Sequence, residues 1–148
     1  MITYRKATQK DAEQIATRMT NLHKGMTAKE HKAEVEFFMK TKPFFVAFEK
    51  EKLVGYLFGD IRKEYVEGSQ QFENPKVGYI ESLYVLPSYR RHGIGEQLFE
   101  MLEVWAKEKG ATEMGSDAYA TNTVSRKFHK ALGFEESKPI VHYIKKLP

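Results

Sequence analysis

The sequence predicts an α/β (α+β) fold in which helices flank a mixed, mostly antiparallel sheet. Segments that resemble strands and helices follow one another in the order β, α, α, three or more strands, α, β, α, β, which is typical of one layered domain. The composition, with 41% apolar and 30% charged residues, is that of a globular protein. No linker divides the chain, so we expect residues 1–148 to form a single domain.

The composition also excludes several classes of protein. A formal net charge of +4 suits an anionic ligand but is too small to indicate nucleic acid binding. Because the chain has no cysteine, disulfides, thiolate metal sites and a cysteine nucleophile are excluded. The polar N-terminus does not resemble a signal peptide and no apolar run reaches the roughly 20 residues that span a bilayer, so we expect a cytoplasmic protein. His23, His31, His92 and His142 lack metal-ligand spacing, and we expect no metal.

The N-terminal part of the chain predicts one strand and two helices. Residues 2–7, ITYRKA, resemble a short strand. Each helix opens on a capping box, formed by Thr8 with Asp11 and by Thr27 with Glu30. The residues expected to face inward are Ile15, Met19 and Leu22 in the first helix and Val35, Phe38 and Met39 in the second.

The rest of the chain predicts a hairpin and two further pairs of helix and strand. Residues 44–66 resemble a hairpin, residues 76–87 a strand, 111–120 a fifth strand and 138–146 an alternating final strand. A long helix begins at the two glycines before residue 96 and ends at Gly110, and a shorter one begins near Asn122. The apolar stripes expected of these helices are Ile94, Leu98, Leu102 and Trp105 in the first and Val124, Phe128 and Leu132 in the second.

The segment VLPSYRRHGIGEQL, residues 85–98, predicts a phosphate-binding turn. A helix start presents unpaired N–H groups and a positive dipole end to an anion. Gly93 and Gly95 let the backbone approach a phosphate closely, and Arg90 and Arg91 add charge. The spacing fits neither the dinucleotide fingerprint nor a Walker A loop.

Two segments resemble the cofactor-binding motifs of the GNAT N-acetyltransferases. RRHGIG at residues 90–95 matches their Arg/Gln-x-x-Gly-x-Gly/Ala segment, and ALGFEE at residues 131–136 matches their second cofactor segment. Five further stretches, EYVEG, YIESLYVLPSYRRHGIG, EVWAKEKGATEMGSDA, TNTVSRKFHKALGFEE and YIKK, make residues 60–147 most similar to the bacterial aminoglycoside 6'-N-acetyltransferases.

This resemblance implies acetyl-CoA as the cofactor. The pyrophosphate is expected on the backbone amides of residues 91–96 and the pantetheine arm beside residues 83–85. Asn122 and Ser125 either bind that arm or cap their helix. The expected cofactor-binding residues are Leu83, Tyr84, Val85, Arg90, Arg91, His92, Gly93, Ile94, Gly95, Glu96, Asn122 and Ser125.

Glu81 and His129 are the expected catalytic residues. In YIESLYV, alternation places Glu81 on a largely apolar face with Val77, Tyr79, Leu83 and Val85, where a carboxylate needs either a task or an ion-pair partner. The resemblance implies that Glu81 deprotonates the substrate amine through water or holds the ammonium.

Three residues are candidates for the group that donates a proton to the leaving sulfur. His129 stands where many GNAT enzymes have a tyrosine, as in the aminoglycoside branch, and histidine donates protons near neutral pH. A hydrogen-bonded structural role for His129 is an equal alternative. Tyr84 or Tyr143 would then be the donor.

The expected substrate-binding residues are Tyr65, Glu81, Asp117 and His23. Asp117 ends the fifth predicted strand, where turn formation is the alternative, and His23 stands near the place of a tryptophan in related enzymes. Another amine (a polyamine, small metabolite or peptide N-terminus) and a non-catalytic acyl-CoA-binding domain remain alternatives. The partner is thus a small-molecule amine, not nucleic acid or membrane, and the resemblance implies a homodimer.

Overall fold

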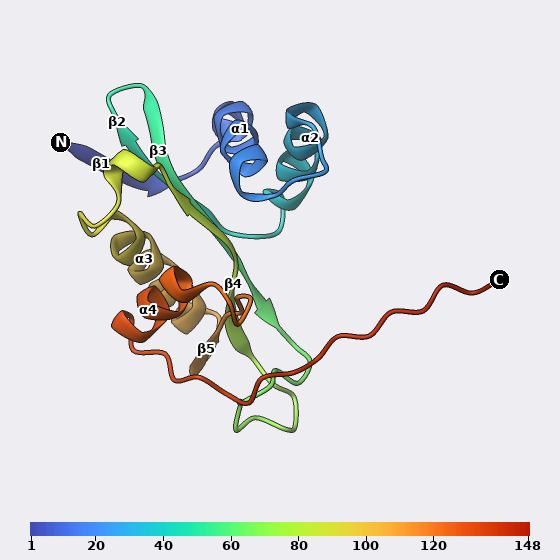
Figure 1. The fold of residues 1–148 in the computed structure, drawn as a ribbon. Coiled ribbons are helices and arrows are strands. Elements are labelled where there is room, and N and C mark those ends of the chain that lie inside the picture. The colour runs from blue at the N-terminus through green and yellow to red at the C-terminus, as the bar shows by residue number, and fades with distance from the viewer.

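The computed structural model describes residues 1–148 as one five-stranded sheet with helices on both faces (Figure 1). The strands lie in the order β1-β2-β3-β4-β5; β1 to β4 pair antiparallel, whereas β4 and β5 are parallel. The predicted fold class is confirmed. The elements are β1 (Ile2–Lys6), α1 (Ala12–Leu22), α2 (Ala28–Phe38), β2 (Phe44–Glu49), β3 (Lys52–Arg62), β4 (Val77–Val85), α3 (Ile94–Glu108), β5 (Glu113–Gly115) and α4 (Thr123–Ala131), with short 3₁₀ turns at Gln9–Asp11 and Pro87–Tyr89.

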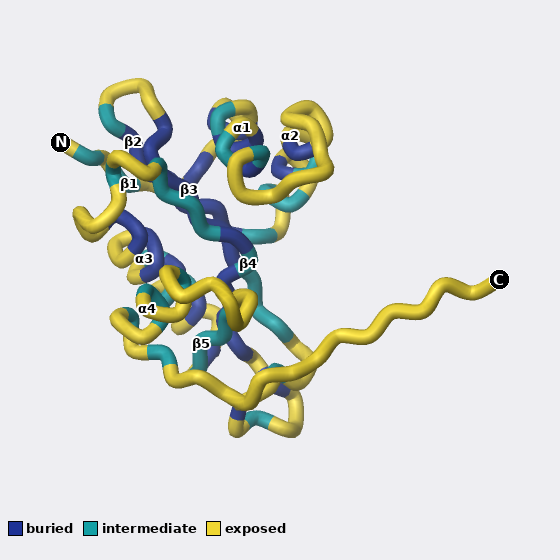
Figure 2. The backbone as a smooth tube through the Cα atoms, in the orientation of Figure 1, coloured by how far each residue is buried: buried dark blue, intermediate teal, exposed yellow.

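The sheet separates two apolar cores, and its central strands are the most buried part of the molecule (Figure 2). On one face α1 and α2 contribute Ile15, Met19 and Val35 to a core that includes Tyr56 of β3. On the other face α3 contributes its predicted apolar stripe. Burial of these side chains, at about 25 cal/mol per Å², is the main source of stability for both layers. No helix is long and apolar enough to cross a membrane.

Both predicted capping boxes form. The Thr27 amide donates to Glu30 Oε2 at 2.9 Å while the Glu30 amide donates to Thr27 Oγ1 at 3.1 Å, and the Thr8 amide donates to Asp11 Oδ2 at 2.7 Å. In α1 and α2, one residue predicted to face inward does not: Leu22 is 42% exposed. It ends α1, and the loop that follows is itself exposed and does not cover it.

Strand β4 forms as predicted, but the shared face predicted for its side chains is wrong for Leu83 and Val85. Phe58 pairs with Ser82 and Gly59 with Ile80, so Glu81 is an extra residue without a partner on β3. Such a bulge reverses the alternation that follows it. Leu83 therefore packs in the α3 core, whereas Tyr79 and Glu81 share the opposite side through a common contact with Arg62.

The last third of the chain departs most from the prediction. Strand β5 has three residues, Glu113–Gly115, and Val124 of α4 is 73% exposed because no other element covers that side of the helix. The predicted strand at residues 138–146 does not form; residues 134–148 carry no regular structure, and after Ser137 the chain extends away from the body (Figures 1 and 2). A strand needs a partner backbone, and this segment runs from Ser137, beside Gly68, away from the sheet.

Candidate active site

The turn before α3 has the geometry that an anion site needs. Arg91 and Gly93 adopt left-handed conformations, with φ of +64° and +79°, and Gly93 is the residue that caps α3. The first helical hydrogen bond runs from the Gln97 amide to the Gly93 carbonyl at 3.0 Å. The six amides of residues 91–96 therefore donate to no other group of the chain and are available to an anion.

The two arginines of this turn have different environments. Arg90 donates through Nε to the Val85 carbonyl at 2.8 Å and lies 5.4 Å from the centre of the Tyr84 ring. Its side chain therefore links the turn to the end of β4. Arg91 is exposed and forms no ion pair within the chain, so its charge is free for a phosphate group.

Helices α3 and α4 meet at a glycine. A Cβ at Gly95 would lie 3.0 Å from the ring of Phe128, so the absence of a side chain permits the close approach. Asn122 caps α4 by accepting from the Ser125 amide at 3.1 Å. The capping role of Asn122 is thus present in the structure, and a contact with the pantetheine arm stays a prediction.

One edge of β4 is unpaired next to this turn. The parallel pairing with β5 covers only Val77–Tyr79 of β4. From Glu81 to the end of the strand, the edge toward β5 has no neighbouring strand, because β5 stops at Gly115. Residues 83–85, the stretch expected beside the pantetheine, lie on this free edge, where backbone groups are open to an extended ligand.

Three charged and aromatic side chains form a cluster with Glu81. Arg62 donates through Nε and Nη2 to the two carboxylate oxygens of Glu81 at 3.0 and 3.1 Å, and its guanidinium lies 3.8 Å from the centre of the Tyr79 ring. Tyr79 in turn donates its hydroxyl to Asp117 at 2.7 Å. Burial, then the contact with Asp117, raises the pKa of Tyr79, and the hydrogen bond to Glu81 raises the pKa of Arg62.

The structure thus brings Glu81 and Asp117, two of the predicted substrate-binding residues, into one network. Arg62 and Tyr79 were not among the predicted site residues. Arg62 stands in DIRKEYV at the end of β3, where its register partner on β4 is Val77, and its side chain reaches Glu81 from there. The signal available in the sequence was the need of a carboxylate in an apolar strand for a cationic partner.

His129 is held by two hydrogen bonds. Nδ1 lies 2.7 Å from the Ser125 carbonyl, which is only an acceptor, so Nδ1 carries the proton. Nε2 lies 2.7 Å from Ser116 Oγ and accepts from that hydroxyl when the ring is neutral. Of the two alternative donors, Tyr84 packs against the α1–α2 core, whereas Tyr143 is 91% exposed in the C-terminal extension.

The remaining predicted substrate residues lie on two different elements. Tyr65 is 48% exposed and stacks on Phe72 within the β3–β4 loop, with ring centres 5.5 Å apart. His23 follows α1, and its Nε2 lies 3.4 Å from Ser82 Oγ on β4. Partial burial lowers the pKa of His23, and the neighbouring His31 lowers it further. Tyr65 and His23 make no contact with each other.

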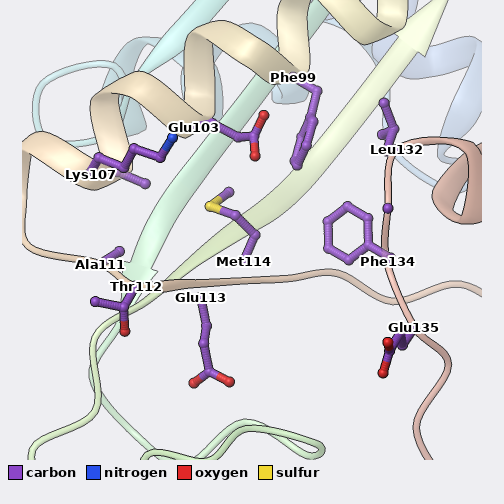
Figure 3. A pocket seen from close by; sticks show the side chains of 12 residues that line it. Phe99, Glu103, Lys107, Ala111, Thr112, Glu113, Met114, Leu132, Phe134 and Glu135 are labelled. Atoms are coloured by element: carbon purple, nitrogen blue, oxygen red, sulfur yellow. The ribbon is translucent and has the colours of Figure 1, made fainter.

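A separate cavity of about 360 Å³ lies on the other side of the sheet (Figure 3). It lies between the second half of α3, β5 and the segment after α4, with Phe99, Met114 and Phe134 on its walls. None of the predicted site residues lines it. This cavity is therefore distinct from the cluster around Glu81.

The fold and the glycine turn place the chain in one class of protein, the α/β domains whose central strand leads through a glycine turn to a helix start with free amides. Residues 10–134 match the model of the Acetyltransferase (GNAT) family, and the chain belongs to that family. This confirms the resemblance found in the sequence.

Within this family, the chain is similar to proteins named aminoglycoside N(6')-acetyltransferase type 1. The chain is 39% identical over 102 residues to aminoglycoside N(6')-acetyltransferase type 1 of Acinetobacter haemolyticus, covering 69% of this chain and 68% of that one. With the Serratia marcescens enzyme of the same name, identity is 33% over 122 residues, or 80% and 81% of the two chains.

Two solved structures are similar in fold to this chain over nearly its whole length. The crystal structure of the 6'-N-acetyltransferase AAC(6')-Ih from Acinetobacter baumannii has a TM-score of 0.91 at 28% identity and covers 100% of both chains. AAC(6')-Iy in complex with the bisubstrate analogue CoA-S-monomethyl-acetylneamine has a TM-score of 0.90 at 30% identity, covering 99% of both.

Proposed function

We propose that this chain transfers the acetyl group of acetyl-CoA to the 6'-amine of aminoglycosides. The observation that carries the proposal is the pair of carboxylates in one cluster: Glu81 lies on β4, the strand that leads to the six free amides before α3, and Asp117, after β5, joins it through Tyr79. Carboxylates suit a cationic amine, and free amides at a helix start suit a pyrophosphate. The relatives named aminoglycoside N(6')-acetyltransferase, and the neighbour bound to an analogue that joins CoA to acetylneamine, support the same pair of substrates.

The cofactor is proposed to lie across the free edge of β4 and the turn. Bound there, acetyl-CoA supplies an acyl group activated as a thioester. The amides of residues 91–96 would hold its pyrophosphate, together with the guanidinium of Arg91. Backbone groups of residues 83–85 and the side chains of Asn122 and Ser125 would hold the pantetheine arm.

The proposed chemistry requires a neutral amine and a proton for the departing sulfur. Glu81 would accept the hydrogen bonds of the amine, directly or through water, and Asp117 and Tyr65 would hold the sugar. As the carbon–nitrogen bond forms and the carbon–sulfur bond breaks, a proton moves to sulfur. His129 would give this proton from Nε2 in its doubly protonated form, because in the neutral ring Nδ1 carries the proton and Nε2 only accepts from Ser116 Oγ. The proton that the amine nitrogen loses would pass to Glu81, directly or through water.

The test of the proposed function is release of thiol from acetyl-CoA, followed with a chromogenic thiol reagent. The chain has no cysteine, so the protein itself adds no background. The panel pairs aminoglycosides that carry a 6'-amine with matched ones that carry a 6'-hydroxyl, and adds polyamines and peptides. We expect release only with the 6'-amino members. Release with polyamines or peptides alone would contradict the aminoglycoside substrate, and silence with every amine would favour an acyl-CoA-binding domain.

We also propose a cytoplasmic homodimer. The C-terminal extension alternates apolar residues that are largely exposed, among them Ile140, Val141, Tyr143 and Ile144 at 62% to 96%. Apolar side chains displayed on an extended segment are typical of a strand that pairs with another chain. The free edge of β5 is a strand edge to which such a segment from a second copy can add.

A further inference from the structure

We infer that Arg62 is an internal cation that occupies the binding place of the substrate ammonium in the free protein, and that the amine must displace it. The inference rests on the proposed function, because it assigns Glu81 to the substrate amine. It adds Arg62 as a residue that determines which amines are accepted.

The contacts of Arg62 are those expected of a bound cation. Its guanidinium donates to both carboxylate oxygens of Glu81, at 3.0 and 3.1 Å. The central carbon of the guanidinium lies 3.8 Å from the centre of the Tyr79 ring. A carboxylate beside an aromatic face is the environment that recognises an organic ammonium or guanidinium. In the free protein this place is filled by the chain itself.

Asp117, the second carboxylate of the cluster, also has a hydrogen-bond partner within the chain. Asp117 accepts the hydroxyl proton of Tyr79 at 2.7 Å, so the two acids are linked through the same aromatic ring. The cluster holds two carboxylates and one guanidinium, a formal charge of −1 with Arg62 in place. If Arg62 swings away, Glu81 and Asp117 together face the ligand, and the attraction for a polycation rises.

Arg62 is placed so that it can leave. It is the last residue of β3, it precedes the long loop to β4, and its side chain is 33% exposed. The Glu81 side chain, at 22% exposed, is on the more buried side of the pair. A long flexible side chain at a strand end can therefore turn to water while the carboxylate stays in position.

The exchange predicts selectivity among amines. A ligand that has a single ammonium group exchanges one cation for another at Glu81, so it gains little from this contact. An aminoglycoside brings further ammonium groups, which gain Asp117 and the net negative charge of the cluster. Arg62 therefore disfavours simple amines relative to polycations.

The kinetic test compares Arg62→Met and Arg62→Lys with the unchanged protein. With methionine, we expect KM to fall about threefold for a 6'-amino aminoglycoside and about tenfold for a simple monoamine, while kcat changes by less than about threefold. Lysine should give intermediate values because it keeps the charge without the two-point contact. Arg5→Met is the control: Arg5 also pairs with both oxygens of a carboxylate, that of Asp11, in another part of the molecule. A higher KM with a lower kcat for Arg62→Met, restored by lysine, would overturn the inference and make Arg62 a residue that orients Glu81.

A second measurement is independent of turnover. The Nε–H signal of Arg62, assigned by its loss in Arg62→Lys, is followed by NMR while neamine is added to the whole protein without acetyl-CoA. We expect the Nε–H signal of Arg62 to shift as neamine binds, because Glu81 then no longer holds the guanidinium. Neamine binding with an unchanged Arg62 signal would overturn the exchange while leaving the proposed function intact. A shifted Arg62 signal with no acetylation in the thiol assay would support the exchange and contradict the proposed function. Failure of neamine to bind either Arg62→Met or the unchanged protein would overturn both the exchange and the proposed function.

Discussion

At the scale of single residues, the structure explains how a carboxylate is kept in the middle of β4. Glu81 lies at the bulge, on the Tyr79 side of the sheet, and Arg62 compensates its charge there. A half-buried carboxylate without such a partner is costly. The residues expected to act on the substrate amine are therefore stabilised before any substrate binds.

The first prediction concerns Glu81→Gln. Glutamine keeps the size of the side chain but cannot hold a proton or an ammonium charge, so kcat is expected to fall about 100-fold, the usual size of a lost acid–base contribution. The affinity for acetyl-CoA, measured by calorimetry, should change by less than about twofold, because the amides of residues 91–96 are untouched. Unchanged turnover would remove Glu81 from the mechanism.

The second prediction concerns the Arg5–Asp11 pair at the start of the fold. The side chain of Asp11 is 7% exposed and accepts from Arg5 at 2.7 and 2.9 Å, and that contact first of all lowers its pKa. A carboxylate with a lowered folded pKa stabilises the protein above its unfolded value of about 3.9 and loses this contribution as pH falls through the folded pKa.

Asp11→Asn should therefore remove part of the loss of Tm below about pH 4 and cost roughly 1–3 kcal/mol at neutral pH. Thermal unfolding followed by circular dichroism from acid to neutral pH measures both effects. Glu136→Gln is the control, since its pair with Arg126 lies at the surface and such pairs contribute little. An Asp11→Asn protein with the same pH profile as the unchanged protein would contradict the assignment.

At the scale of elements, the glycine turn and α3 act as a unit. Gly93 caps the helix at φ +79°, and the left-handed conformations of Arg91 and Gly93 aim successive amides outward. Space is not the reason for glycine here, because a Cβ at Gly93 would meet nothing within 4 Å. The conformation is the reason, and it is costly for a β-branched residue.

The third prediction follows from that conformation. Gly93→Val should shift the turn out of the left-handed region and weaken acetyl-CoA binding at least tenfold, a cost of about 1.4 kcal/mol. Gly25→Val is the matched control, because Gly25 also has a positive φ, +100°, and open space around its Cβ, but lies between α1 and α2. Equal loss of acetyl-CoA affinity in both variants would mean that general destabilisation, not the turn, is responsible.

At the scale of the whole molecule, the sheet is unfinished at the β5 side. β5 has three residues and one free edge, while residues 138–148 extend away with their apolar side chains exposed (Figure 2). An exposed apolar extension of this kind is a liability in a monomer. A second copy that receives the extension would relieve it.

The fourth prediction is that deletion of residues 138–148 converts a dimer to a monomer. Light scattering coupled to gel filtration should give twice the 17.2 kDa chain mass for the full protein and a single chain mass for the shortened one. Ile140→Lys with Ile144→Lys is the companion variant, since it removes two exposed apolar groups but keeps the backbone. A full-length protein that is monomeric at micromolar concentration would contradict the homodimer.

The sequence predicted best where the signal is local. Capping boxes, the strands β1 to β4 and the apolar stripe of α3 depend on residues close to one another in the chain, and all of them form. Predictions failed where a distant partner decides the outcome. The face of Leu83 depends on the bulge, the exposure of Val124 on what covers α4, and the final strand on a neighbouring backbone.

The same division holds for the candidate site. The sequence by itself determined the fold class, the family and the positions of the phosphate turn and of Glu81, because these are read from spacing and residue type. Only the tertiary structure decided that Arg62 pairs with Glu81, that Tyr79 joins Arg62 to Asp117, and that Ser116 holds His129. Those contacts depend on strand register and on the path of the chain after β5, and no local pattern encodes either one.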